Sequence, residues 1–486
     1  MRLEILNVRL GLATNSSSSH SIIFLKPGEK LRDDMAGQSD GEFGWDHFTA
    51  ASRELRDKYV AGTLYATLNH MFLDGKDWDT EHEAAYAASR AIVMEWVGTT
   101  ADEEGYVDHQ SVYDLPKTFD GKSLHRGFFD AFREFLTQPG LAILGGNDNT
   151  KMRHPAMQSH KQISLPLPRD TSYPLVCRWD EAHRFWTIFN RETGAKFRMR
   201  FVTSPDEKIE IQPDRASAPE LVDVKITDFC PYGCPYCYQG STTGGLHADH
   251  DYLGTVYQAL RELEVFEVAI GGGEPTLHPE FLGILKMFRL NGIVPNFTTR
   301  NLAWMKDSTL CGPIMENCGA VGFSVDKADA VADLYEALTA AKIEPHRFAV
   351  QVVVGAVPAS ELETIMRSAA KVGFRVVLLG YKTTGRGSEV VPETYDWTEI
   401  VSRLRKAKNL PSLGIDTALA ATSVPKLEAL NIPRWMYAVE EGHFSCYVDA
   451  VAKKIGPSSY CDPAQMRPLV KATADEVATT FQTFAR

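Results

Sequence analysis

From residue 220 onward, short β-branched apolar runs alternate with stretches of helical periodicity. Apolar runs bounded by turn residues predict buried strands, and apolar positions three and four residues apart predict amphipathic helices. The predicted strands cover residues 221–226, 265–270, 293–298, 320–325, 348–354, 374–380 and 412–416. The predicted helices cover residues 251–263, 279–290, 302–310, 327–342, 359–371 and 395–408. This alternation predicts a parallel sheet with right-handed crossovers, and six or more units predict a partial or full β/α barrel.

The first part of the chain has a different pattern. Helical spacing of apolar residues recurs over 50–59, 82–97 and 123–137. Three strand-like runs separated by polar turns then predict a small antiparallel meander. These runs cover residues 175–179, 185–189 and 196–201. The predicted domains are an N-terminal α+β accessory domain (1–212), a linker (213–219), the α/β barrel (220–420) and a C-terminal extension (421–486).

Composition narrows the class of protein. The apolar fraction of 44% is enough for a sizeable core, and the net charge of −12 argues against a protein that coats nucleic acid through unspecific phosphate contacts. A nucleotide or a local basic groove stays possible. The first 25 residues contain no uninterrupted apolar region, and no apolar run is long enough to span a membrane. We therefore expect a cytoplasmic location without a membrane partner.

Three of the eight cysteines stand close together after the first predicted barrel strand. Cys230, Cys234 and Cys237 have the spacing C-x3-C-x2-C, and the two prolines and the glycine between them favour an irregular loop. In a β/α barrel, the chemistry lies where strands end and the following loops begin. Such a loop can wrap several thiolates around one centre, so the triplet predicts a metal or cluster site in place of core packing.

Two kinds of centre suit these thiolates. Structural zinc normally takes four closed ligands, often as two CxxC pairs, and the next possible ligands, His247 and His250, lie ten or more residues further on. An iron–sulfur cubane normally takes four cysteines, so three leave one iron open to chelate a small molecule. The spacing favours the cluster, and a zinc-stapled, non-enzymatic binding module is the alternative.

The motif C-x3-C-x-aromatic-C after a first barrel strand resembles the radical S-adenosylmethionine (SAM) superfamily. The resemblance implies a [4Fe–4S] cluster on the three cysteines, with SAM chelated to the open iron. It implies that an electron from the cluster cleaves SAM into methionine and a 5′-deoxyadenosyl radical, which takes a hydrogen atom from the substrate. A low-potential electron donor such as flavodoxin or ferredoxin is then a partner. In this family the aromatic residue before the third cysteine, here Tyr236, lies against the adenine.

The second predicted strand extends the resemblance. It ends in Gly271-Gly272-Gly273-Glu274-Pro275, which is similar to the family's GGEP motif. The backbone and glutamate of that motif hold the SAM amino group, and glycines let a backbone approach a ligand closely. The resemblance therefore assigns Gly272, Gly273 and Glu274 to cofactor binding.

Three later strands end in further polar residues. Ser324 and Asp326 lie two apart, hence on one face, and in the family such residues contact the ribose or the SAM carboxylate. An ordinary helix N-cap is the alternative for Asp326. Arg300, after the third strand, is placed to meet a carboxylate. The loop after the sixth strand is rich in glycine and basic, so Lys382 and Arg386 are predicted to bind an anionic substrate, with a solvated turn as the alternative.

The other five cysteines are interpreted separately. Cys446 and Cys461 faintly resemble the hairpin of SPASM or twitch extensions, but an auxiliary cluster needs further cysteines that the tail lacks. Cys311 and Cys318 lie seven apart on a predicted helix and Cys177 lies on a predicted strand, so core packing is expected for all three.

The resemblance implies how the radical is made and leaves the substrate open. Residues 12–21 resemble openings of phage-encoded proteins. Phage radical SAM proteins of this build are similar to those of thymidine hypermodification, where a radical step rearranges an amino-acid adduct on the base. This implies an isomerase acting on modified thymidine in phage DNA, in the host cytoplasm, with a small-molecule or DNA-linked nucleotide substrate. The alternative is modification of a ribosomal peptide, with 1–212 as a leader-binding domain whose meander pairs with an extended peptide.

Overall fold

The computed structural model of the chain describes most of the barrel and part of the N-terminal half. The described residues are 18–25, 30–35, 42–43, 47–73, 87, 91, 133–147, 167–183, 185–200, 215–430, 432 and 437–484. Within them, no helix is both long enough and apolar enough to cross a membrane.

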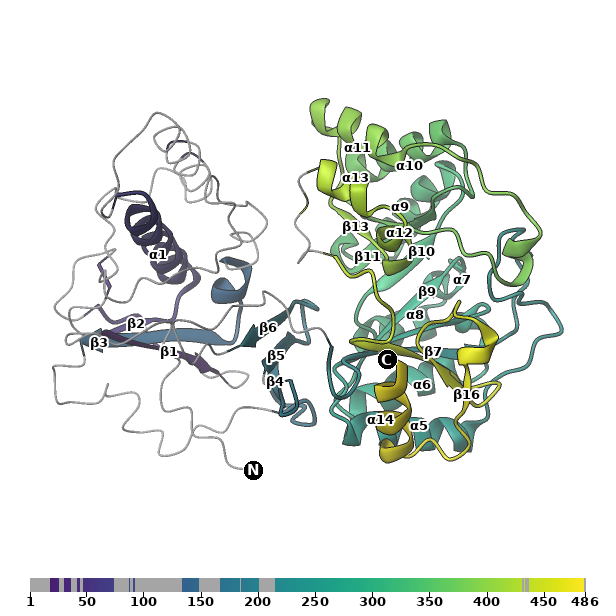
Figure 1. Ribbon diagram of the computed structural model, residues 1–486, viewed down its shortest axis with the longest axis horizontal. Helices are drawn as coiled ribbons and strands as arrows, with labels where there is room; N and C mark the ends of the chain where they lie inside the picture. The colour runs from purple at the N-terminus through teal and green to yellow at the C-terminus, as the bar shows by residue number, and fades with distance from the viewer. Residues whose placement is uncertain are drawn as a thin grey trace.

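A ten-stranded sheet forms the core of the larger part of the molecule (Figure 1). Its order is β13-β12-β11-β10-β9-β8-β7-β14-β15-β16, and the strands from β7 to β13 are parallel and follow the order of the sequence. These strands are β7 (Leu221–Thr227), β8 (Glu267–Gly272), β9 (Val294–Thr299), β10 (Val321–Ser324), β11 (Phe348–Val353), β12 (Arg375–Leu379) and β13 (Leu413–Ile415). Each overlaps a predicted strand. The sheet has edges at β13 and β16, so the predicted α/β architecture is confirmed as a partial barrel.

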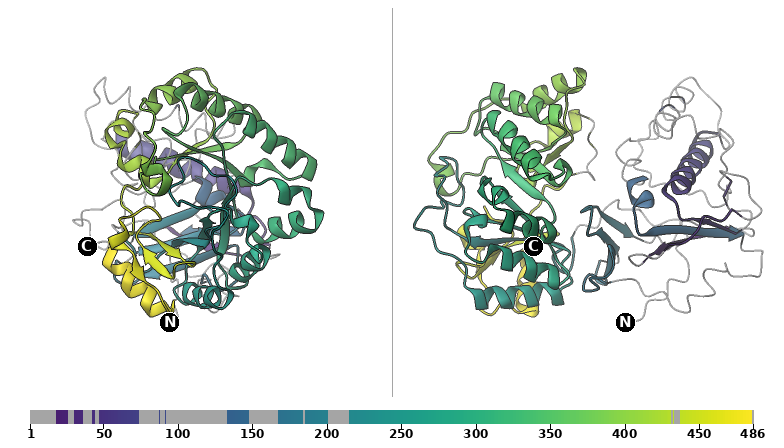
Figure 2. Two further views of the ribbon diagram at one scale, coloured as in Figure 1. Left: turned by 90° about the vertical axis from the view of Figure 1, so that its right-hand side faces the viewer. Right: turned by 180° about the vertical axis from the view of Figure 1, so that it is seen from behind.

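Helices cover the outside of this sheet and form an arc around it in the left view of Figure 2. They are α5 (His250–Glu262), α6 (Phe281–Leu290), α7 (Ala303–Lys306), α8 (Ser308–Asn317), α9 (Asp329–Ala341), α10 (Ala359–Val372), α11 (Trp397–Lys406), α12 (Thr417–Ala421), α13 (Val424–Ala429) and α14 (Ala474–Phe484). Short 3-10 helices lie at Pro275–Leu277, Pro345–Arg347, Gly385–Ser388 and Pro463–Gln465. The predicted helix 302–310 is split between α7 and α8, because the Asp307 side chain accepts a hydrogen bond from Thr309 N (2.8 Å) and starts a new helix.

The two faces of β7 explain how the sheet separates core from site. Val222, Val224 and Ile226 are buried in the apolar core shared with the outer helices. Because side chains alternate along a strand, Asp223 and Lys225 lie on the opposite, inner face. A strand with an apolar outer face and a polar inner face gives the partial barrel a polar interior.

The C-terminal part of the chain completes the sheet beside β7. β14 (Ser445–Asp449) pairs with β7 in parallel, with Ser445 opposite Leu221. β15 (Lys454–Gly456) and β16 (Arg467–Pro468) continue the sheet as antiparallel strands. Residues 445–468 therefore belong to the same sheet as the predicted barrel.

The N-terminal half contains two small antiparallel sheets. The first has the order β1-β3-β2, from β1 (Ser18–Phe24), β2 (Phe48–Ala50) and β3 (Leu141–Asn147), and was not predicted. Helix α1 (Arg53–Leu73) contains most of the predicted helix 50–59. The predicted helix 82–97 lies outside the described residues apart from two positions, and 123–137 is described, and helical, from 133 to 137.

The second small sheet is the predicted meander, and its order β4-β5-β6 confirms that prediction. Its strands are β4 (Leu175–Asp180), β5 (Phe185–Asn190) and β6 (Lys196–Arg200). It lies between the N-terminal sheet and the partial barrel (Figure 1). Phe189 of β5 packs on Phe266, which directly precedes β8, with ring centres 5.4 Å apart. The meander therefore contacts the amino-terminal end of the parallel strands.

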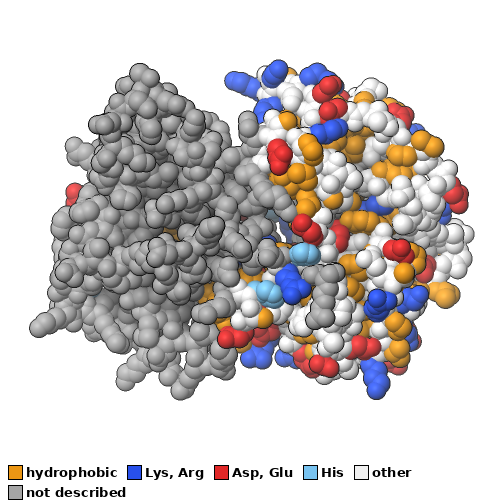
Figure 3. Space-filling view, viewed as in Figure 1, with side chains coloured by type: hydrophobic (Ala, Val, Ile, Leu, Met, Phe, Trp, Pro, Cys, Tyr) orange, Lys and Arg blue, Asp and Glu red, His pale blue; other side chains and the backbone are white. Residues whose placement is uncertain are grey.

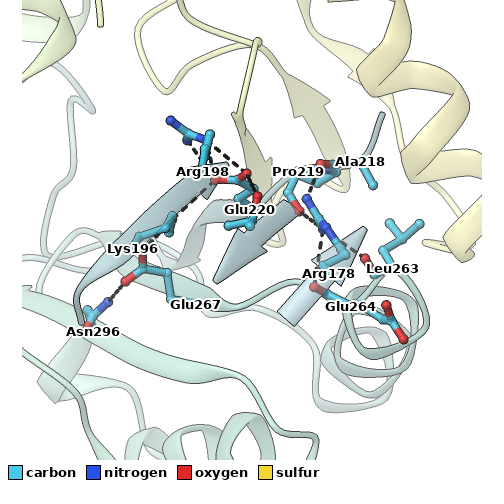
Figure 4. Close-up of polar contacts among 11 residues, drawn as sticks. Arg178, Lys196, Arg198, Ala218, Pro219, Glu220, Leu263, Glu264, Glu267 and Asn296 are labelled. Carbon is cyan, nitrogen blue, oxygen red and sulfur yellow. Dashed lines mark hydrogen bonds and ion pairs between the residues drawn. The ribbon is translucent and has the colours of Figure 1, made fainter. Parts of the chain in front are cut away.

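Polar contacts reinforce this interface (Figure 4). Glu220, directly before β7, is fully buried and accepts hydrogen bonds from Arg198 Nη2 (2.7 Å) and Thr187 Oγ1 (2.6 Å). Lys196 Nζ lies 2.9 Å from Glu267 Oε1 at the start of β8. Burial alone would raise the pKa of Glu220, but the charges of Arg198 and Lys196 lower it to about 2. The carboxylate is thus the ionic centre of the interface.

The segment predicted as a linker is held on both sides in its described part. Arg178 of β4 donates to the carbonyl oxygens of Pro219 and Ala218, both at 2.9 Å. On the other side, Ala216 N donates to His443 O (2.9 Å). Residues 216–219 are therefore part of the interface between the meander and the barrel.

Candidate active site

The cysteine loop follows β7 at the carboxyl end of the parallel sheet. Backbone hydrogen bonds from Asp228 N to Leu246 O (2.7 Å) and from Cys230 N to Thr242 O (2.9 Å) fix its start. Gly233 has a φ of +61°, a conformation in which other residues are strained. The half-buried, free thiols on this loop are those of Cys230, Cys234 and Cys237.

The donor set of this loop fits an iron–sulfur cluster. Burial raises the pKa of Cys230, and the charges of Glu274, Cys234 and Cys237 raise it further. Three thiols on one irregular loop can hold a [4Fe–4S] cluster with one iron left open, whereas structural zinc normally takes four closed ligands.

The glycine turn after β8 packs directly on the cysteine loop. Gly273 N donates to Thr227 O (2.7 Å), and Glu274 N donates to Phe229 O (2.8 Å). A Cβ on Gly273 would lie 2.1 Å from Phe229 O, and one on Gly272 would lie 2.3 Å from Thr227 O. A side chain does not fit at either position. The glycines therefore let two loops meet backbone to backbone, whereas Gly271 faces open space.

Glu274 is the buried anchor of this turn. Its side chain is 2% exposed, and Oε1 accepts hydrogen bonds from the hydroxyls of Thr276 and Thr299, both at 2.6 Å. Oε2 accepts from the backbone N of Arg300 (3.0 Å). Glu274 thus links the carboxyl ends of β8 and β9, and Oε2 keeps capacity for another donor.

Arg300 joins the loops after β7, β9 and β10. Its Nη1 lies 3.1 Å from Cys234 Sγ, its Nη2 lies 2.7 Å from Asp326 Oδ2, and its Nε donates to Ser324 O (3.2 Å). Tyr236 Oη donates to Asp326 Oδ2 at 3.4 Å. Asp326 does not cap α9, because the N-cap of that helix is Ala328. The structure therefore brings the predicted residues from three loops into one contiguous group.

Comparison with known proteins identifies the fold to which this group belongs. Residues 224–329, which include the cysteine loop, the glycine turn, Arg300 and Asp326, match the family model of the radical SAM superfamily. The chain therefore contains a segment that is similar to the radical SAM superfamily. No curated protein matches the sequence.

Several solved structures are similar to the chain. Streptococcus suis SuiB bound to its precursor peptide SuiA has 11% identity and a TM-score of 0.44, with 59% of this chain and 82% of that chain covered. Histidine-tagged anSMEcpe with bound AdoMet has 16% identity and a TM-score of 0.39, covering 55% and 82%. BtrN in complex with AdoMet and 2-DOIA has 12% identity and a TM-score of 0.30, covering 55% and 85%.

The radical SAM domain implies SAM and a [4Fe–4S] cluster as cofactors. Cys230, Cys234 and Cys237 are the predicted cluster ligands, and the residue-level roles in SAM binding stay predictions. The residues concerned are Tyr236, Gly272, Gly273, Glu274, Ser324 and Asp326. All lie at or just beyond the carboxyl ends of β7, β8 and β10, where a β/α fold carries its chemistry.

Arg386, in the 3-10 helix Gly385–Ser388 after β12, packs against the cysteine loop. Its Nε donates to Cys234 O (3.1 Å), its Nη1 donates to Ser241 O (2.9 Å), and its backbone N donates to Cys237 O (3.0 Å). Nη2 is buried without a described partner. These contacts give Arg386 a loop-holding role that the sequence did not indicate, and binding of a substrate anion stays a prediction.

Lys382 lies in the barrel interior among aromatic rings and carboxylates. Its Nζ is 3.4 Å from Asp416 Oδ2, and 4.8 and 4.7 Å from the ring centres of Tyr238 and Tyr460. Tyr460 Oη donates to Glu441 Oε1 at 2.5 Å. The ammonium therefore already has counter-charges, which sequence reasoning did not foresee.

A buried group of ion pairs connects the cysteine loop to β7 and β14. It was not predicted from the sequence. Lys225 of β7 contacts Asp228 on the cysteine loop, and its Nζ lies 3.1 Å from Asp449 Oδ2 on β14. Burial lowers the pKa of Lys225, but Asp449 and Asp228 outweigh it and raise the pKa overall. The sequence feature that could have indicated it is the pair Asp223 and Lys225, two charged residues at inward positions of an otherwise apolar strand.

The remaining cysteines divide as follows. Cys177, Cys311 and Cys318 are buried, which confirms the predicted core packing. Cys446 is also buried in the core, whereas Cys461 is half-buried. Neither belongs to a group of metal-binding side chains among the described residues.

Replacing Glu274 by glutamine should weaken SAM binding more than cluster assembly. An amide nitrogen in place of one carboxylate oxygen faces donors from Thr299 or Arg300, so the β8 and β9 loops lose their alignment. Losing one charge-assisted hydrogen bond, about 1.5–3 kcal/mol, corresponds to at least roughly tenfold weaker SAM binding. Titration with SAM and iron counting measure the two effects separately. Glu280→Gln, at an exposed position nearby, is the control; equal losses of SAM and iron would contradict the expectation.

Proposed function

We propose that the chain cleaves SAM reductively at a [4Fe–4S] cluster on Cys230, Cys234 and Cys237. The observation that carries the proposal is the packing of the cysteine loop against the Gly271–Glu274 turn and Arg300, at the carboxyl ends of adjacent parallel strands. When bound and reduced, the cluster supplies the electron that breaks a sulfur–carbon bond of SAM. This yields methionine and a 5′-deoxyadenosyl radical, which takes a hydrogen atom from the substrate.

The residues of this chain would hold and orient the reactants. The open space at Gly271 lies beside the turn that the family uses for the SAM amino group, and Oε2 of Glu274 can accept a further hydrogen bond. Tyr236, on the cysteine loop, and Asp326, after β10, both contact Arg300. These positions support SAM binding between the β8 and β10 loops.

For the substrate, we propose an amino-acid-modified thymidine of DNA, whose adduct is rearranged by the radical. The support beyond the sequence resemblance is the mixed charge around Lys382. Asp223 and Glu441 interact with each other and with Lys382, and burial together with Glu441 raises the pKa of Asp223 to about 7. A lysine beside carboxylates suits an amino acid, which carries both an ammonium and a carboxylate group. A phosphate group would interact favourably with the lysine only, and not with the carboxylates around it.

On the face seen in Figure 3, acidic and basic side chains of the described part are interspersed, without an extended basic area. Electrostatic binding along a DNA backbone needs a basic stripe or patch. We propose that the modified nucleotide is presented at the barrel mouth.

Peptide modification is the second candidate, and one observation bears on its geometry. The β4-β5-β6 meander contacts the amino-terminal ends of β7 and β8, through Glu220 and Glu267, whereas the cysteine loop follows the opposite end of β7. A leader peptide paired with the meander would have to pass along the barrel to reach the cysteine loop. Modification of a residue distant from the leader fits this arrangement better than modification close to it.

Anaerobic incubation with SAM, dithionite and deuterated candidate substrates tests the proposal. Formation of methionine and 5′-deoxyadenosine supports SAM cleavage, and deuterium in the 5′-deoxyadenosine identifies the substrate. Deuterium transfer from modified thymidine in DNA supports the isomerase, whereas transfer only from a peptide replaces it by the second candidate. A colourless reconstituted protein that holds stoichiometric zinc would remove the enzyme proposal in favour of a zinc-stapled binding module.

We also propose a cytoplasmic location, because the thiolates of a [4Fe–4S] cluster need the reducing conditions of a cytoplasm.

A further inference from the structure

Arg300 has an unusual distribution of partners for a single side chain. Its guanidinium contacts a cysteine sulfur, a carboxylate, a phenol oxygen and a backbone carbonyl. The four partner atoms are Cys234 Sγ (3.1 Å), Asp326 Oδ2 (2.7 Å), Tyr236 Oη (3.4 Å) and Ser324 O (3.2 Å). The sulfur is the one predicted cluster-ligand atom for which a side-chain hydrogen-bond donor is described.

The position of Arg300 is fixed independently of the sulfur. Its backbone N is held by Glu274 Oε2 at 3.0 Å, and its Nε is held by Ser324 O. A guanidinium is planar and presents its donors in a rigid fork, so fixing one edge fixes the direction of the other donors. Nη1 therefore points at Cys234 as a consequence of the fold of three loops.

A cationic donor at a cluster thiolate has a defined electrostatic effect. Reduction adds an electron to the cluster, and a hydrogen bond from a positive group stabilises the added negative charge. Hydrogen bonds to the sulfurs and local charge are among the main determinants of iron–sulfur reduction potentials. Arg300 is about one-fifth exposed, so solvent screens this interaction only in part.

We propose that Arg300 is a positioning residue that donates to the Cys234 thiolate and sets the reduction potential of the bound cluster, with Asp326 as the opposing charge. The proposal rests on the proposed function, because it presupposes a cluster on the cysteine loop. Asp326 pairs with Nη2 of the same guanidinium and withdraws part of its positive field. Removing Arg300 and removing Asp326 should therefore shift the potential in opposite directions.

The test uses the full chain, reconstituted anaerobically with iron and sulfide. Iron and sulfide are counted, and the midpoint potential is measured by redox titration followed by electron paramagnetic resonance, without SAM. Arg300→Gln should keep its cluster and make reduction about tenfold less favourable, which is a midpoint about 59 mV lower for a one-electron couple. Arg300→Lys keeps the charge but loses the planar, forked arrangement of donors. Its midpoint potential should lie between those of the wild type and Arg300→Gln. Asp326→Asn should move the midpoint upward.

The control is Arg367→Gln, which removes an equal charge from the exposed face of α10, where Arg367 pairs with Glu363 (2.6 Å). Its midpoint should equal that of the wild type. An unchanged midpoint in Arg300→Gln, or shifts of the same sign in Arg300→Gln and Asp326→Asn, would overturn the inference and leave the proposed function intact. Loss of the cluster in both Arg300 variants would likewise overturn it, since Arg300 would then act in assembly. A wild-type chain that takes up no cluster would overturn the proposed function itself.

Discussion

Replacing Cys234 by alanine is expected to abolish cluster binding and SAM cleavage while the fold is retained. Most contacts at this residue use its backbone: Cys237 N donates to Cys234 O at 3.2 Å, and Arg386 Nε donates to the same oxygen. An alanine keeps these contacts and loses only the sulfur. The loop should therefore fold with two thiols, which is too few for a cluster with a single open iron.

The measurement is iron content, visible absorbance and 5′-deoxyadenosine formation after anaerobic reconstitution, with the thermal midpoint as a check on folding. Cys461→Ala is the matched control, because Cys461 is also half-buried and free but lies outside the loop. It should behave as the wild type. If Cys234→Ala still produces 5′-deoxyadenosine, the ligand assignment is wrong.

Replacing Glu220 by alanine is expected to have the largest effect on stability. The carboxylate is fully buried. Its loss leaves Arg198 and the buried Thr187 hydroxyl without this acceptor and removes one of the two counter-charges of Lys196. Breaking a buried pair by removing one partner costs about 3–5 kcal/mol. For a unit of this size, the thermal midpoint should fall by roughly 10 °C. Glu192→Ala, an exposed glutamate on the same meander, should change the midpoint little; similar midpoints for both variants would disprove a central role for Glu220.

The same residue gives a pH dependence with a definite sign. The folded-state pKa of about 2 lies below the ordinary value of 4.5, so ionised Glu220 stabilises the folded state. This contribution is complete above pH 4.5 and is lost as the pH falls from there towards about 2. A Glu220→Gln variant lacks the contribution at every pH. The difference in the free energy of unfolding between this variant and the wild type should therefore shrink as the pH falls through this window. A difference that stays constant in acid unfolding experiments would contradict the assignment.

The sequence predicted the parts of the fold that depend on local periodicity. Each strand from β7 to β13 combines apolar positions with nearby turn residues, so its place along the chain could be predicted. The cysteine triplet and the glycine turn were recognisable because their chemistry is concentrated in a few consecutive residues. That both lie at the carboxyl ends of neighbouring parallel strands followed from the predicted topology.

Contacts between distant residues could not be predicted in the same way. The four partners of Arg300 depend on how three loops are stacked, and the contact of Arg386 with the cysteine loop joins residues about 150 positions apart. The N-terminal strand β3 was missed because its apolar residues run directly into Gly145 and Gly146, which weaken a strand signal. Pairing of 445–449 with β7 has no local signature at all.

That last pairing determines when the site can form. β7 leads into the cysteine loop, and one of its edges is unpaired until β14 joins the sheet. Until then, Lys225 also lacks its ion pair with Asp449, which lies 224 positions later in the sequence. Closing so long a loop is slow and entropically costly, and an open parallel edge is prone to pair with other chains. During synthesis, the cysteines therefore leave the ribosome well before the strand that braces them. A cluster inserted early would meet an unfinished scaffold, so we expect any cluster insertion to follow the pairing of β14 with β7.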